Sequence, residues 1–242
     1  MTTDATGAAA QAAMIDHDHA DVTGGWLRPA VFGAMDGLVT NIALISGVGG
    51  GGVSPRTVIL TGVAGLVAGA VSMGLGEYTS VRAQNDQVAA EVEKERRELQ
   101  INPEAEAEEL ALRWMERGLP ADLAREVASR ISLDPEEALR VHAQEELGID
   151  PDDVPSPWIA AISSFICFSV GALFPLFPYL LGVTVLWPAL VVGAVGLFVA
   201  GALTARFTGK SWWYSGGRQL LMGAAAAGVT YLIGHLIGVS TG

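Results

Sequence analysis

The sequence predicts an all-α fold, a membrane protein of five transmembrane helices with a cytoplasmic helical insert between helices two and three. Half of its 242 residues are apolar and its mean hydropathy is +0.39, yet its formal net charge is -12. An ordinary soluble domain rarely combines these properties. The charge is concentrated in residues 82–153, which hold 20 of the 26 acidic and 9 of the 14 basic residues. The composition therefore predicts an apolar membrane part and an acidic polar insert.

Five stretches are long and apolar enough to cross a bilayer as helices, which takes about 20 residues each. They run approximately over Pro29–Gly49, Val58–Val81, Trp158–Leu181, Val183–Ala205 and Gly217–Val239. The residues ahead of the first stretch predict a disordered tail. The predicted organisation is a tail, helices one and two, the acidic metal-binding insert, and helices three to five, over residues 1–25, 26–82, 83–156 and 157–242.

Basic residues near the ends of the spans predict the orientation. The outer side of the predicted topology carries only Arg56, whereas the tail, the insert and the loop between spans four and five carry Arg28, Arg82, Arg206, Lys210 and Arg218. The positive-inside rule therefore predicts that the N-terminus and the insert are cytoplasmic. The expected location is the inner cell membrane in a bacterium and the vacuolar membrane in a eukaryote.

Composition and motifs exclude several classes of function. A net charge of -12 argues against nucleic acid as a partner and favours cations. The single cysteine, Cys167, excludes an internal disulfide and a cysteine-based zinc site. The glycine run at residues 49–52 is not followed by the Lys-Ser/Thr pair of a P-loop, so we expect no ATP-driven pumping.

Helix signals divide the insert into segments. Asn102 and Asp134 are each followed by proline, which predicts two helix N-termini, the second with a capping box. Gly118 and Gly148 suit helix C-termini. The predicted helices are a continuation of span two to about Leu99, followed by Pro103–Arg117, Ala121–Arg130 and Pro135–Leu147.

Two pairs of carboxylates stand at helical spacing in the insert, Glu95 with Glu98 and Glu106 with Glu109. Residues three apart share a helix face, so the two charges of each pair repel unless a cation bridges them. Hard or borderline divalent ions suit such a bridge. The alternative is an ordinary solvated acidic face, and spacing alone does not decide between them.

Two carboxylates fall inside predicted spans. Asp36 lies about seven residues into span one, and Glu77 lies near the cytoplasmic end of span two. A carboxylate in the membrane is costly and predicts a functional site. Met73 shares a face of span two with Glu77, and a thioether beside carboxylates would suit a borderline metal such as Fe²⁺. The two spans run antiparallel, so Asp36 and Met73 can lie at the same depth.

Small residues recur at spacing four in the first two spans. Gly33 and Gly37 form one such pair, and Gly65 and Gly69 form another. Such pairs let helix backbones approach closely. They predict either contact between two copies of the chain or packing within one copy.

The motifs of spans one and two resemble those of the vacuolar iron transporter family. They are D-G-L-V-T-N at residues 36–41 and V-A-G-A-V-S-M-G-L-G-E-Y at residues 67–78, with an acidic domain between spans two and three. The resemblance implies a homodimeric exchanger that moves Fe²⁺, and often Mn²⁺, out of the cytosol against protons. It implies no prosthetic group, and a conduit at the dimer interface that includes Asp36 and Met73.

The resemblance also implies metal ligands in the insert, at Glu95, Glu98, Glu106, Glu109 and Glu146. Two positions depart from the plant-type pattern. Gly65 stands where plant-type members have a glutamate, so we expect Glu77 to take part in proton coupling in its place. His142 stands where they have a methionine near the metal, and a neutral imidazole can also bind Fe²⁺.

The alternatives to an exchanger are a ferroxidase, a passive channel and an iron buffer. A ferroxidase with a di-iron bundle needs Glu-x-x-His motifs on two helices, and no histidine here has a glutamate three residues before it. A passive divalent-cation channel would move metal without regard to a pH gradient. A membrane-anchored iron buffer would bind metal without moving it, and the Asp16–His19 segment could add a weak metal-binding tail.

Overall fold

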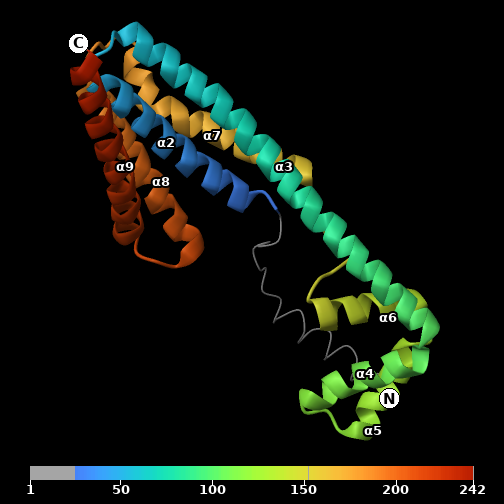
Figure 1. The fold of residues 1–242 in the computed structure, drawn as a ribbon. Helices are drawn as coiled ribbons and strands as arrows, with labels where there is room; N and C mark the ends of the chain where they lie inside the picture. The colour runs from blue at the N-terminus through green and yellow to red at the C-terminus, as the bar shows by residue number, and fades with distance from the viewer. Residues whose placement is uncertain (1–24, 152, 242) are drawn as a thin grey trace, which may run out of the picture.

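The computed structural model describes residues 25–151 and 153–241, and every regular element in these residues is a helix. The predicted tail, with its Asp16–His19 segment, lies almost wholly outside the described residues. Five helices are long and apolar enough to span a membrane (Figure 1). They are α2 (Leu27–Gly50), α3 (Pro55–Ile101), α7 (Pro157–Leu180), α8 (Leu186–Thr208) and α9 (Trp212–Thr241). The predicted all-α fold with five apolar spans is confirmed.

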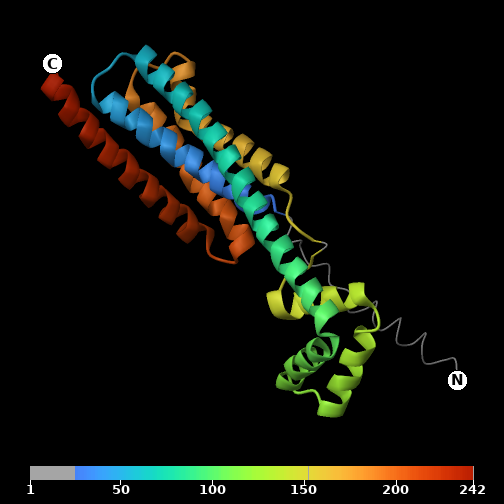
Figure 2. The same cartoon turned by 45° about the vertical axis from the view of Figure 1, so that its right-hand side comes forward.

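Helix α3 is much longer than a membrane span. Its 47 residues form one continuous helix of about 70 Å, at about 1.5 Å per residue. Ser54 caps its first turn by accepting a hydrogen bond from the backbone N–H of Thr57, and Pro55 occupies the first helical position. Both views show its first half packed in the bundle and its second half projecting beyond it (Figures 1 and 2). The helix therefore links the bundle directly to the insert.

Helix α2 is the centre of the bundle and packs against the other four long helices. Gly33 and Gly37 lie against the backbone of α7, where a Cβ on Gly33 would come within 2.6 Å of the carbonyl oxygen of Ser164. A Cβ on Gly37 would overlap the carbonyl oxygen of Phe168. Of the two predictions for this glycine pair, packing within one chain is the one observed.

We expect Gly37→Ala to destabilise the bundle, because the added methyl group would also lie 3.0 Å from the backbone nitrogen of Ala172. Overpacking of this kind costs about 1–3 kcal/mol. Gly76→Ala is the matched control, since its Cβ meets no atom within 4 Å. Thermal unfolding in detergent should show a lower midpoint for Gly37→Ala and an unchanged or raised midpoint for Gly76→Ala. Equal midpoints for the two variants would contradict the close packing of α2 on α7.

The insert consists of α4 (Pro103–Glu116), α5 (Ala121–Ile131) and α6 (Pro135–His142), followed by one π-helical turn (Ala143–Leu147). These bounds agree closely with the predicted helices. The helices share a small apolar core around Leu110, Ala111, Ala124 and Ala128. The core holds α4 and α5 together and leaves the acidic faces of α3, α4 and α6 turned toward one another.

The two predicted N-caps of the insert differ in outcome. The Oδ1 atom of Asp134 accepts hydrogen bonds from two backbone N–H groups of α6, as predicted, but the carboxylate of Glu137 pairs with Arg140 and does not close the capping box. Asn102 occupies the N-cap position of α4 without capping it, because its amide donates to Glu98. Gly118 and Gly148 end their helices with positive φ, as predicted.

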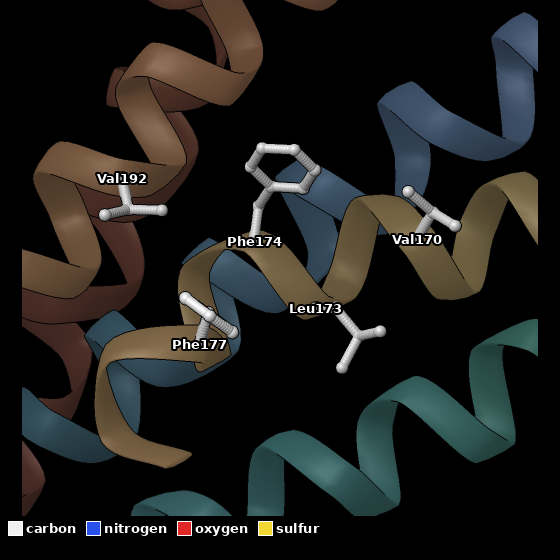
Figure 3. A pocket seen from close by; sticks show the side chains of 5 residues that line it. All are labelled: Val170, Leu173, Phe174, Phe177 and Val192. Atoms are coloured by element: carbon white, nitrogen blue, oxygen red, sulfur yellow. The ribbon is translucent and has the colours of Figure 1, made fainter. Parts of the chain in front are cut away.

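Apolar side chains cover the outside of the bundle. A hollow of about 350 Å³ lies between α7 and α8. Figure 3 shows the side chains that line it, Val170, Leu173, Phe174, Phe177 and Val192. The lining contains no polar side chain, so the hollow offers no group that could hold an ion. Such a surface suits contact with lipid chains.

Candidate metal site

Four side chains from separate parts of the insert converge at one point. Glu95 comes from the far part of α3, Glu106 from the first turn of α4, His142 from the end of α6, and Glu146 from the π-helical turn. One ligand atom of each lies within 4.8 Å of the other three. We call these four residues the quartet. Three carboxylates and an imidazole at this spacing form a set of ligands suited to a borderline divalent metal.

The imidazole of His142 is the centre of the quartet. Its Nδ1 atom lies 3.1 Å from an oxygen of Glu95, 3.2 Å from an oxygen of Glu146 and 3.8 Å from an oxygen of Glu106. One ring nitrogen carries at most one proton, so it can donate a hydrogen bond to only one of the three carboxylates at a time. The two carboxylates that do not accept this hydrogen bond then face each other, and no other member of the quartet can donate a hydrogen bond to them. A metal ion at this point would satisfy all of them together.

Burial makes the arrangement costly without a cation. The side chain of His142 is fully buried, and those of Glu95, Glu106 and Glu146 are 12%, 12% and 15% exposed. Desolvation raises the pKa of Glu95 above its ordinary value, the negative charge of Glu146 raises it further, and His142 opposes both. Desolvation and then Glu109 raise the pKa of Glu106. Both shifts show that the quartet disfavours unneutralised carboxylates.

Local sequence explains how the end of the insert contributes two members of the quartet. His142 and Glu146 are four residues apart, so they project from the same side of the chain. The π-helical turn begins directly after His142 and ends at Gly148, which has a φ of +66°. A residue with a side chain is strained at that φ, so glycine suits the position where the chain leaves the site. Single π-helical turns often occur at functional sites.

Two predicted ligands lie beside the quartet and not within it. The carboxylate of Glu98 accepts a hydrogen bond from Asn102 at 3.3 Å. The carboxylate of Glu109 accepts one from Arg113 at 3.1 Å. Both are close enough for their charges to raise the pKa of Glu106. Sequence reasoning missed Arg113, although its position four residues after Glu109 is the spacing of a helical ion pair.

The predicted residues of the membrane part are more dispersed. Asp36 is half-buried on α2 and accepts a hydrogen bond from the hydroxyl of Thr40 at 3.0 Å. Met73 packs against a cluster formed by Ala70, Phe168 and Ala172. Glu77 is also half-buried, and no hydrogen bond or ion pair joins it to another described residue. Thr40 was not anticipated from the sequence.

The depths of Asp36 and Met73 follow from the register of α2 and α3. Side-chain atoms of Asn41 and Leu44 lie against the position of Gly65. Because the two helices are antiparallel, moving five residues from Asn41 toward the start of α2 reaches Asp36 and corresponds to moving five residues from Gly65 along α3, which reaches Ala70. Asp36 therefore lies at the same depth as a position on α3 that is about one helical turn from Met73.

Comparison with known proteins agrees with these features. The sequence profile of the VIT family matches residues 27–235. The vacuolar iron transporter of Acanthamoeba castellanii is 37% identical over 220 residues, which cover 88% of this chain and 79% of that protein. Vacuolar iron transporter 1 of Arabidopsis thaliana is 28% identical over 214 residues, with coverage of 87% and 86%. Since the family match includes residues of all five apolar helices, the chain is a multi-pass membrane protein that belongs to the VIT family.

Proposed function

We propose that this protein exports Fe²⁺, and also Mn²⁺, from the cytosol in exchange for protons. The relatives are named as iron transporters, which supports a transporter and not an enzyme. The observation that carries the proposal is the convergence of three carboxylates on the buried imidazole of His142, at one end of a helix that continues into the membrane. The quartet would capture the ion, and the membrane part would move it.

Capture close to the membrane is supported by the geometry of α3. Glu95 lies 14 residues beyond Val81, the predicted end of span two. At about 1.5 Å per residue this separation is about 21 Å. Glu98 and Glu109 extend the negative surface around the quartet, so cations would gather there. The insert would thus raise the concentration of metal near the bundle.

Passage through the membrane is assigned to Asp36, Met73 and Glu77. Asp36 would accept the partly dehydrated ion, with the thioether of Met73 at a similar depth. Protonation of Asp36 or Glu77 would weaken the attraction for metal and release the ion outward. Glu77 is the candidate for proton coupling because Gly65 offers no side chain.

The proposed orientation and assembly follow from the surface of the bundle. The start of α2 and the connection between α8 and α9, which carry basic residues predicted to be cytoplasmic, lie at the end of the bundle nearest the insert (Figure 1). This placement supports a cytoplasmic insert. The outward face of α3 is exposed and apolar over Leu60, Val67, Val71 and Leu75. A second copy covering this face would form the homodimer, and the conduit would then run between the copies. Lipid would cover the remaining apolar surface.

Uptake by proteoliposomes tests the proposal. The full chain should carry Fe²⁺ and Mn²⁺ into vesicles under reducing conditions, as detected by an internal metal-sensitive dye, and protein-free vesicles should not. Oxygen consumption on addition of Fe²⁺ in air should stay at the level without protein, because the quartet contains one histidine and lacks the two Glu-x-x-His motifs of a di-iron oxidase. Metal-dependent oxygen consumption without uptake would contradict a transporter.

A further inference from the structure

Among the described residues, Arg113 is the arginine whose side chain forms an ion pair with a member of the quartet. Its Nη2 atom lies 3.6 Å from an oxygen of Glu146 and 3.1 Å from an oxygen of Glu109. The other oxygen of Glu146 is the one that faces His142. One guanidinium nitrogen therefore bridges a member of the quartet and a carboxylate beside it.

The position of Arg113 on α4 explains the bridge. Glu106, Glu109 and Arg113 follow one another at spacings of three and four, so they lie along one face of α4. The side chain is about one-third exposed, and its Nε atom is buried without a hydrogen-bond partner. The side chain is thus held against the site, and its position is not that of a freely solvated surface arginine.

A cation in this position has two opposing effects. It stabilises the metal-free insert, because it offsets part of the repulsion among the carboxylates. It also opposes metal binding, because a divalent ion must attract oxygens that already have a positive partner and must approach a fixed positive charge. Transport needs binding that is strong enough for entry and weak enough for release.

We propose that Arg113 is an internal counter-ion that competes with the captured metal ion for Glu146 and Glu109, and so sets the affinity of the site low enough for release. This inference rests on the proposed capture site. Arg113 is a positioning residue that acts through the carboxylates and does not itself bind the metal. When metal enters, the guanidinium gives up Glu146 and remains paired with Glu109.

Calorimetric titration of the full chain in detergent with Co²⁺ tests this role. Co²⁺ binds ligands similar to those of Fe²⁺ but is not readily oxidised by air. Arg113→Gln should lower the Kd about two- to fivefold, the range expected when a partly exposed ion pair stops competing. Arg113→Lys keeps the charge and should bind with nearly the parent affinity. Arg117→Gln is the matched control, because it removes the same charge one turn further along and breaks a contact with Glu145, outside the quartet.

The sign of the change separates competition from a structural role. If Arg113 only held the insert together, Arg113→Gln would bind metal more weakly and unfold at a lower temperature. Competition predicts tighter binding together with a lower unfolding midpoint of the metal-free protein. An unchanged or raised Kd in Arg113→Gln, with binding by the parent intact, overturns the inference alone. No binding by the parent overturns the capture site itself, and the inference with it.

Discussion

Asp36→Ala is expected to reduce metal transport by about 100-fold or more while leaving metal binding to the insert unchanged. The carboxylate lies on α2 within the membrane part, where an ion that has lost water needs a negative partner. A 100-fold fall in transport corresponds to roughly 2.7 kcal/mol. The electrostatic attraction between the ion and the carboxylate, at contact distance in a region of low dielectric constant, is larger than this. Uptake by proteoliposomes and calorimetric binding to the same preparation measure the two quantities.

Thr40→Val is the control for this prediction. It removes the hydrogen bond to Asp36 but keeps the carboxylate. A hydrogen bond contributes about 0.5–1.5 kcal/mol, so transport should fall about tenfold at most. Parallel loss of transport and of binding in Asp36→Ala would contradict the division of labour between membrane part and insert. Normal transport by Asp36→Ala would remove Asp36 from the conduit.

Glu95→Gln is expected to weaken binding at the quartet by about 100-fold or more, because substitution of residues that merely support metal ligands already costs about 10–100-fold. Glu108→Gln is the matched control on α4. Glu108 is held outside the quartet by Arg125, whose hydrogen bonds lower its pKa. Calorimetry with Co²⁺ should therefore separate the two variants clearly. Equal affinities for both would show that the carboxylates bind metal only as a diffuse surface charge.

The same site gives binding a defined pH dependence. Metal needs the deprotonated carboxylates, and the pKa values of Glu95 and Glu106 are raised. Binding should therefore weaken on acidification at a pH above the ordinary carboxyl range. The stability of the metal-free protein should change with pH in the opposite direction. A carboxyl group whose pKa is raised in the folded state makes the free energy of unfolding fall as the pH rises through that pKa. Unfolding midpoints across pH, with and without Co²⁺, should show this reversal.

The positions of the helices could be predicted from the sequence, but the contacts between the helices could not. Hydropathy located the five spans, and prolines with Asp134 located the helices of the insert, because these signals are local. Helix α9 begins at Trp212, five residues before the predicted span, because Trp212, Trp213 and Tyr214 have low hydropathy values although they belong to the helix. The partner of Gly37 could not be predicted, because spacing is the same for contacts within a chain and between chains.

The candidate site was predicted in its residue types and only partly in its geometry. Spacing paired Glu95 with Glu98, whereas the quartet takes one member of each predicted pair and adds His142 and Glu146 from the end of the insert. That combination depends on how α3, α4 and α6 pack, which no local pattern records. His142 was a candidate ligand through the family resemblance alone, because no local pattern separates a single helix histidine from a surface one; its complete burial makes the distinction.

Proton movement during Fe²⁺ uptake distinguishes an exchanger from a passive channel. Proteoliposomes containing the parent chain and a pH-sensitive dye would receive external Fe²⁺ under reducing conditions. For an exchanger, Fe²⁺ entry is expected to be accompanied by proton movement in the opposite direction, and an imposed proton gradient of matching sign is expected to accelerate entry. Fe²⁺ entry with constant internal pH and no response to the gradient would contradict an exchanger and indicate a passive channel.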